Sequence, residues 1–167
     1  MLVAEILGLD IVYRPMDKAV RWHTSGLSAV TDLDVLREVI METLLQLDNM
    51  ILEKEGKQAW LTFTRVSHLN AVNDDGTVQI GQVALAIRED PDIRIVVIRG
   101  RGRAFCTGID LKQLSAGDID MGYHERWEKA LRVFEQMEKI VLVGMHGYCL
   151  GGGLQLALAS DIRVSTP

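Results

Sequence analysis

Residues 150–164 of the chain have the sequence LGGGLQLALASDIRV, in which three consecutive glycines precede a leucine-rich segment. The leucines recur with helical spacing, and the segment that follows them, DIRVS at 161–165, is typical of a strand. Because adjacent glycines cost backbone entropy, they indicate a place where something approaches the backbone closely. A tight turn before a helix is the simpler alternative. With either explanation, the stretch predicts a glycine turn, a helix and a strand.

The segments before this stretch continue the alternation of strands and helices. IRIVVIRG at 93–100 and IVLVGMHG at 140–147 are nearly continuous apolar runs, as expected of strands covered on both faces. GTVQIGQVALAIRED at 76–90 has helical spacing and is stopped by Pro91, and HERWEKALRVFEQME at 124–138 is amphipathic. Such alternation predicts right-handed β-α-β crossovers and an α/β fold with a mostly parallel sheet.

Nearer the N-terminus the pattern changes. MILEKEG at 50–56 and KQAWLTFTR at 57–65 are short β-prone runs around a Glu-Gly turn, which predicts a hairpin. Before them, VLREVIMETLLQL at 35–47 predicts a helix with Asp32 or Asp34 as its N-cap. The apolar face of that helix contains Val35, Ile40, Leu44 and Leu47. This face either packs on its own domain or forms a surface for a partner or a second copy.

Length and composition exclude several classes of protein. A chain of 167 residues suits one domain, and we expect a helical extension over 1–48 and a core over 49–167. The net charge of −5 and the lack of a basic run argue against nucleic acid as a partner. No apolar stretch approaches the roughly 20 residues of a membrane helix. The N-terminal stretch carries Glu5 and no basic region, so no signal peptide is expected. The only cysteines, Cys106 and Cys149, have no metal-type spacing, which indicates a reducing, cytoplasmic setting and no metal site.

Two glycine-containing loops follow predicted strands and precede predicted helices. The first lies within RGRGRAFCTGIDLKQL at 99–114, and the second is HGYCLGGG at 146–153. Ligands of open α/β folds bind at the carboxyl ends of strands, where helix N-termini offer free N–H groups. One donor from each loop can converge on a single carbonyl oxygen. Phosphate binding is a further alternative, but the pattern GxxxxGK[ST] is absent and the second loop has no lysine.

Four segments together resemble the crotonase family, the enoyl-CoA hydratase/isomerase superfamily. They are ILEKEGKQAWLTFTR, HLNAVN, DPDIRIVVIRGRGRAFCTGIDLK and HGYCLGGGLQLALASDIRV, in the order and at the approximate spacing of the family. The resemblance covers the chain from about residue 50 to its end and implies a crotonase-like fold of ββα repeats. The N-terminal residues lie outside the match.

The resemblance implies a site that binds the thioester of an acyl-CoA. The backbone N–H groups of Ile109 and Gly152 match the two halves of the family's oxyanion hole, which stabilises an enolate. Substrate binding is assigned by position to Ala71, Ala104, Gly108, Asp110, Leu111 and Lys112. Coenzyme A enters as part of the substrate, and no other cofactor is implied. The family also implies a homo-oligomer, a trimer or a pair of trimers.

Gln155 departs from the pattern of the hydratases, which have a glutamate at this position. An amide can orient a water molecule but cannot accept its proton, and general acid–base groups contribute roughly 10²–10⁴-fold to rate. Ordinary hydration is therefore expected to be impaired. The chain is then an isomerase, decarboxylase, hydrolase or another branch with its acid elsewhere, or a degenerate or split subunit that binds acyl-CoA or a partner chain without turnover.

Other proton carriers lie near the predicted site, and the family's second glutamate falls beyond residue 167. We therefore expect the chain to be incomplete, as a fragment or as one half of a split protein. The candidate proton carriers are Asp118, Asp120, His124, Glu125 and His146. A solvent-facing helix start is the simpler explanation of His124 and Glu125, and hydrogen-bonded packing is the simpler explanation of His146. Cys106, Cys149 and Tyr148 are interpreted as packing residues.

Overall fold

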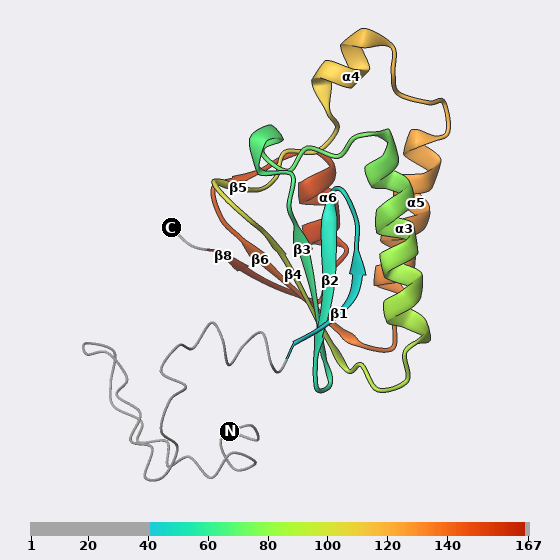
Figure 1. Cartoon of the computed structure of the whole chain (residues 1–167), viewed down its shortest axis with the longest axis vertical. Helices are drawn as coiled ribbons and strands as arrows, with labels where there is room; N and C mark the ends of the chain where they lie inside the picture. The colour runs from blue at the N-terminus through green and yellow to red at the C-terminus, as the bar shows by residue number, and fades with distance from the viewer. Residues whose placement is uncertain (1–40, 166–167) are drawn as a thin grey trace, which may run out of the picture. The chain divides into compact units, whose positions relative to one another are not determined.

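In the computed structural model, which describes residues 41–165, a six-stranded sheet is covered by helices on one face (Figure 1). The strands, in their order across the sheet, are β1 Glu42–Gln46, β2 Met50–Glu55, β3 Gln58–Phe63, β4 Ile95–Gly100, β6 Ile140–Met145 and β8 Ile162–Ser165. The first three strands are antiparallel, whereas β3, β4, β6 and β8 are parallel to one another. The predicted hairpin and the mostly parallel α/β sheet are therefore confirmed.

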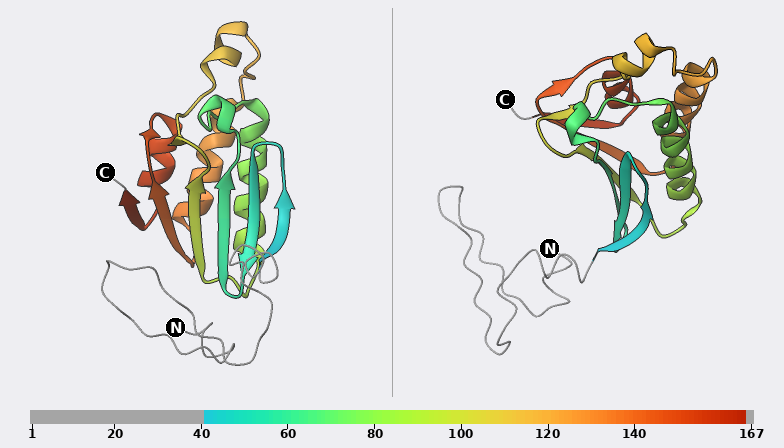
Figure 2. Two further views of the ribbon diagram at one scale, coloured as in Figure 1. Left: turned by 60° about the vertical axis from the view of Figure 1, so that its left-hand side comes forward. Right: turned by 45° about the horizontal axis from the view of Figure 1, so that its top comes forward.

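Helices α3 Asp74–Glu89 and α5 Tyr123–Glu135 lie side by side on the covered face, next to the short α6 Gly152–Leu158 (Figure 2). Asn73 caps α3 by accepting a hydrogen bond from the N–H of Gly76, a common device at helix starts. Helix α4, Leu111–Ala116, extends beyond the end of the sheet, at the top of Figure 1. Among the described residues, no helix is long and apolar enough to cross a membrane.

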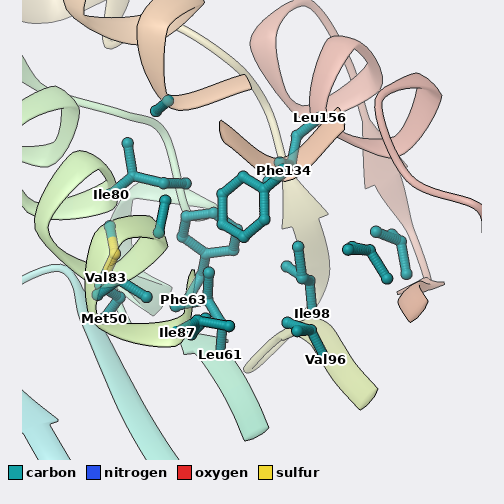
Figure 3. Packing of buried hydrophobic residues seen from close by; sticks show 14 of the residues in the cluster. Met50, Leu61, Phe63, Ile80, Val83, Ile87, Val96, Ile98, Phe134 and Leu156 are labelled. Atoms are coloured by element: carbon teal, nitrogen blue, oxygen red, sulfur yellow. The ribbon is translucent and has the colours of Figure 1, made fainter. Parts of the chain in front are cut away.

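The core lies between the sheet and these helices. Leu61 of β3 pairs in register with Ile98 of β4, which pairs with Val143 of β6, and all three side chains are fully buried. Side chains from α3, α5 and α6 close over this row, as Figure 3 shows for Ile80, Phe134 and Leu156. The alternating burial of strand residues places the opposite set on the other face of the sheet.

The expectation that β4 and β6 are covered on both faces is not met by the described residues. Trp60, Val97 and Leu142 alternate with the core residues of β3, β4 and β6 and are only partly buried. These apolar residues produce the continuous apolar runs that are typical of strands covered on both faces. The described helices nevertheless cover only one face (Figure 2).

The helix predicted over 35–47 is wrong at its C-terminal end, because Glu42–Gln46 forms β1. This segment pairs with β2, and Leu45 lies opposite Leu52, so the backbone groups of β2 gain partners that a helix here would not provide. The rest of the predicted helix, with Val35 and Ile40, lies outside the described residues. The separate N-terminal segment over 1–48 stays a prediction.

A second, two-stranded sheet was not predicted. It consists of β5 Ala104–Cys106 and β7 Tyr148–Cys149, which run parallel. Strands of this length are too short to produce a recognisable alternation of apolar and polar residues. This small sheet nevertheless joins the two glycine-containing loops, and so it determines the geometry of the candidate site.

Candidate functional site

The two glycine loops contact each other directly. The N–H of Leu150 donates to the carbonyl oxygen of Cys106 at 3.0 Å, which continues the pairing of β5 with β7. Gly108 has a φ of +83°, and a Cβ built on it lies 2.8 Å from the backbone nitrogen of Gly152. Any larger residue at position 108 would therefore fill the space beside this N–H group. The predicted convergence of the two loops is present.

The N–H group of Ile109 is oriented by a backbone bridge to the loop around Val72. The N–H of Val72 donates to the carbonyl of Gly108 at 2.7 Å, and the N–H of Asp110 donates to the carbonyl of Val72 at 2.9 Å. In a parallel bridge of this kind, the intervening residue directs its own N–H to the opposite side. Within residues 41–165, neither Ile109 nor Gly152 donates its N–H to a protein acceptor.

Two N–H groups without a protein acceptor in the described part of the chain, on loops that contact each other, are groups that a carbonyl oxygen with developing negative charge would need. They come from loops that are held by backbone hydrogen bonds, so they need little reorganisation when charge develops. Gly153 keeps the loops close, because a Cβ at this position would lie 2.3 Å from the carbonyl oxygen of Cys106. Glycine is thus required there by contact with the neighbouring loop.

Asp110 organises the start of α4 rather than presenting a free carboxylate. It is 4% exposed, caps the helix by accepting from the N–H groups of Lys112 and Gln113, and forms an ion pair of 2.6 Å with Arg65. Burial alone would raise the pKa of Asp110, but the hydrogen bonds from Arg65 and from the backbone outweigh it and hold the pKa below its ordinary value. The charged pair is therefore satisfied within the protein.

The backbone carbonyls of Ala71 and Ala104 are close to this network. Arg65 donates to the carbonyl of Ala71 at 2.9 Å, and the buried side chain of Asn70 donates to that of Ala104 at 2.8 Å. A carbonyl can accept a second hydrogen bond, so neither contact excludes a ligand. The predicted role of both residues in binding the CoA part of a substrate stays a prediction.

Leu111 and Lys112 begin α4 with exposed side chains, and Leu111 is 70% exposed. They lie directly after the Gly108–Asp110 stretch, at the end of the sheet where α4 extends (Figure 1). Their position suits contact with a ligand that enters from this end. Their assignment as substrate-binding residues is a prediction that the structure accommodates.

Gln155 has a partner that the sequence did not reveal. The indole Nε1 of Trp127 donates to Oε1 of Gln155 at 3.0 Å, across from α5 to α6. The same indole ring packs against Gly152, since a Cβ built there would lie 3.2 Å from two ring carbons. Trp127 thus touches both the residue at the acid position and one of the two N–H donors.

Three of the other candidate proton carriers have side-chain hydrogen-bond or ion-pair partners. Asp120 accepts from Arg126 at 3.1 Å, and Glu125 pairs with Lys129 at 2.7 Å on the exposed side of α5. The ring of His146 contacts the carbonyl of Gly102 at 2.9 Å. No cluster of three or more His, Cys, Asp or Glu side chains that could hold a metal ion occurs within 41–165.

The two thiols differ in burial. Cys106 is buried, and this burial raises the pKa of its thiol to about 12, so it is protonated at neutral pH. Cys149 is partly buried, and burial also raises the pKa of its thiol. Their interpretation as small packing residues agrees with these positions, because a nucleophilic cysteine requires the thiolate.

Four residues that support the site were missed by sequence reasoning: Arg65, Asn70, Tyr123 and Trp127. The hydroxyl of Tyr123 donates to the buried carbonyl of Val72 at 3.0 Å and so supports the bridge that orients Ile109. Tyr123 and Trp127 lie four positions apart on the apolar face of α5, which the amphipathic pattern did indicate. The pattern could not show which of its side chains would reach the loops.

Comparisons with known proteins identify the family of the chain. A family profile described as Enoyl-CoA hydratase/isomerase matches residues 53–166. The "Crotonyl-CoA hydratase" of Syntrophomonas wolfei is 35% identical over 122 residues, which cover 71% of this chain and 46% of that protein. The peroxisomal "Delta(3,5)-Delta(2,4)-dienoyl-CoA isomerase" of Arabidopsis thaliana is 32% identical over 117 residues, which cover 62% of this chain and 42% of that protein.

A similar fold occurs in solved structures. The crystal structure of an enoyl-CoA hydratase/carnithine racemase from Magnetospirillum magneticum matches with a TM-score of 0.67 at 29% sequence identity. The match covers 76% of this chain and 48% of that chain. The chain thus spans about half the length of the relatives that it matches.

Proposed function

Because this chain belongs to the enoyl-CoA hydratase/isomerase family, we propose that it acts on an acyl-CoA thioester through an enolate. The thioester oxygen would lie between the N–H groups of Ile109 and Gly152. When a proton leaves the carbon next to the thioester carbonyl, negative charge develops on this oxygen. Losing one donor of this kind typically slows a reaction by about 10²–10³. A reaction that passes through such an enolate is one that a lyase or an isomerase can catalyse.

One observation carries the proposal. Gly108 and Gly152 approach so closely that a Cβ on the first would lie 2.8 Å from the nitrogen of the second. The N–H groups of Ile109 and Gly152 have no protein acceptor among residues 41–165. A loop that served only as a turn before a helix would not require this approach from a separate segment of the chain. The close contact supports a shared ligand atom.

The substitution Gly108→Ala tests the proposal, with Gly117→Ala as a matched control. Both glycines have a similar positive φ, +83° and +79°, so a methyl group strains the backbone similarly in each. Only Gly108→Ala places that methyl beside Gly152, because nothing lies within 4 Å of a Cβ at Gly117. The two variants therefore separate a blocked site from backbone strain.

Two measurements follow from the proposed chemistry, namely binding of butanoyl-CoA compared with CoA and exchange of its α-hydrogens in D₂O. We expect the unsubstituted chain to bind butanoyl-CoA more tightly than CoA. Gly108→Ala should lower that preference and slow the exchange by about 10²–10³, whereas Gly117→Ala should keep both. Equal behaviour of the two variants would contradict the role of the two N–H groups.

A subunit that binds acyl-CoA without turnover is the second candidate function. It is favoured by Gln155, whose amide cannot act as a base and whose oxygen already accepts from Trp127. The same measurements distinguish the two functions. Tight binding of butanoyl-CoA with no exchange of its α-hydrogens would support the non-catalytic subunit.

A homo-oligomer is proposed from the family resemblance. Native mass spectrometry of the chain, compared with its mass of 18.6 kDa under denaturing conditions, tests this proposal. A trimer or hexamer would support it, and a monomer would contradict it.

A further inference from the structure

We propose that Gln155 selects acyl groups with a hydrogen-bond acceptor close to the thioester, such as the carbonyl oxygen of a 3-oxoacyl chain. This inference rests on the proposed function, because it takes the thioester to lie at Ile109 and Gly152. It assigns Gln155 a role in substrate choice. Trp127 is then a positioning residue that acts through Gln155.

The orientation of the Gln155 amide follows from the chemistry of its partner. An indole N–H can only donate a hydrogen bond, so the atom that Trp127 contacts at 3.0 Å must be the amide oxygen. The opposite orientation would place the NH₂ group against another donor. The NH₂ group of Gln155 is therefore directed away from Trp127, and it donates to no residue in the described part of the chain.

The indole is itself held firmly. Trp127 is 4% exposed and belongs to the hydrophobic core cluster, where its ring packs against Gly152. A buried ring of this size cannot change its rotamer without disturbing its neighbours. The amide oxygen of Gln155 is thus hydrogen-bonded to a rigid group, although Gln155 as a whole residue is exposed.

The NH₂ group lies near the place proposed for the acyl chain. Gln155 follows Gly152 by three positions on α6, so both residues occupy one side of the helix. The indole that contacts Gln155 also packs on Gly152, so the amide and the residue that carries the N–H donor lie against the same ring. An acyl group whose thioester oxygen is bound at Gly152 would therefore extend its first carbons toward the side of α6 that carries Gln155.

A fixed NH₂ group discriminates between acyl groups. A 3-oxoacyl chain offers an oxygen that can accept its hydrogen bond, whereas a hydrocarbon chain that covers the amide would displace water from the donor and give it no partner in return. Sites built to hydrogen-bond one polar group of a substrate reject analogues that lack this group. The same NH₂ group cannot accept a proton from water, which agrees with a site that differs from that of a hydratase.

Isothermal titration with acetoacetyl-CoA and butanoyl-CoA tests the inference. We expect the unsubstituted chain of 167 residues to bind acetoacetyl-CoA about fivefold more tightly, the effect of one net hydrogen bond. Gln155→Met removes the donor at similar length and should reduce the ratio of the two affinities to about one. Gln155→Glu replaces the donor by an acceptor and should bring the ratio below one. Because both affinities are measured on the same protein, their ratio does not depend on the fraction of the protein that is folded.

Two further variants complete the experiment. Gln136→Met makes the same change at an exposed position beyond the end of α5 and should keep the ratio of the unsubstituted chain. Trp127→Phe removes the indole N–H and frees the amide to rotate, so the ratio should fall toward one while Gln155 is still present. An affinity ratio near one in this variant would show that Trp127 positions Gln155. A purely structural change would instead weaken the binding of both acyl-CoAs equally and leave the ratio unchanged.

The possible outcomes separate the inference from the proposed function. If both acyl-CoAs bind more tightly than CoA but with equal affinity, the inference is overturned and the proposed function stands. A ratio that survives Gln155→Met also overturns the inference. If neither acyl-CoA binds more tightly than CoA, the proposed function and the inference are overturned together.

Discussion

At the scale of a single residue, Asp110 has two structural roles. Its carboxylate caps α4 and pairs with Arg65, and the residue directly follows Ile109 in the chain. The side chains of Asp110 and Arg65 are 5% and 18% exposed, respectively. Removing one partner of a largely buried ion pair leaves the other charge without compensation, which is strongly destabilising.

We expect Asp110→Asn to lower the free energy of unfolding by about 3 kcal/mol at pH 7. The variant keeps the size of the side chain but leaves the Arg65 charge unpaired. Asp118→Asn is the control, because Asp118 is exposed. Urea denaturation of the two variants measures the difference. Equal stability of the variants would contradict the structural role of the ion pair.

The contribution of Asp110 to the free energy of unfolding should depend on pH. Because its pKa is below the ordinary value in the folded chain, its stabilising effect is complete above the pKa of the unfolded chain, about 3.9. The effect is lost as the pH falls through the folded pKa. The difference in unfolding free energy between the unsubstituted chain and Asp110→Asn should therefore narrow between pH 5 and pH 2. A difference that stays constant over this range would contradict the shifted pKa.

At the scale of elements, α5 connects the core with both sides of the site. Its apolar face packs on α3, while Tyr123 reaches the bridge at Val72 and Trp127 reaches Gln155 on α6. Burial raises the pKa of Tyr123, so its hydroxyl stays protonated and can donate at neutral pH. One helix thereby supports segments that are far apart in the sequence.

We expect Tyr123→Phe to destabilise the chain by about 1 kcal/mol, because the buried carbonyl of Val72 loses a hydrogen bond. Tyr148→Phe provides the matched control, since Tyr148 is 54% exposed. Chemical denaturation gives the stability of both variants. Slower α-hydrogen exchange in Tyr123→Phe would show that the bridge also holds Ile109 in place. A Tyr123→Phe variant as stable as Tyr148→Phe would contradict the prediction.

Sequence patterns predicted the long elements well and the short ones poorly. The periodicity within 76–90 and 124–138 corresponds to α3 and α5, because a long apolar face leaves a clear repeat. LLQL at 44–47 looked helical, but pairing with β2 decided its conformation.

For the site, glycine spacing indicated that the loops at Gly108 and Gly152 converge. It could not indicate the indole that orients Gln155, because Trp127 lies 28 positions away in the sequence. A contact of this kind depends on how two helices pack, and neither helix carries a local signal for it.

At the scale of the whole described region, stability rests on one face of the sheet. The row formed by Leu61, Ile98 and Val143 is fully buried beneath the helices, whereas Ile140 on the opposite face is 51% exposed. The two faces therefore differ in how much apolar surface each side chain removes from water.

We expect Ile98→Ala to destabilise the chain by about 3 kcal/mol, because it removes buried apolar surface and leaves a cavity. Ile140→Ala makes the same chemical change on the open face and should cost less than about 1 kcal/mol. Urea denaturation curves of both variants measure the asymmetry. Similar costs would indicate that the open face is covered in the folded protein.

The two N–H groups at Ile109 and Gly152 belong to the main chain, and this has a consequence for how such a protein can evolve. Mutation replaces side chains but leaves the backbone N–H in place, except where proline enters. The donors therefore persist while the side chains around them, such as Gln155, are exchanged over generations. If these groups bind the thioester oxygen as proposed, a lineage can acquire a new reaction by altering the neighbouring side chains while it inherits the two donors unchanged.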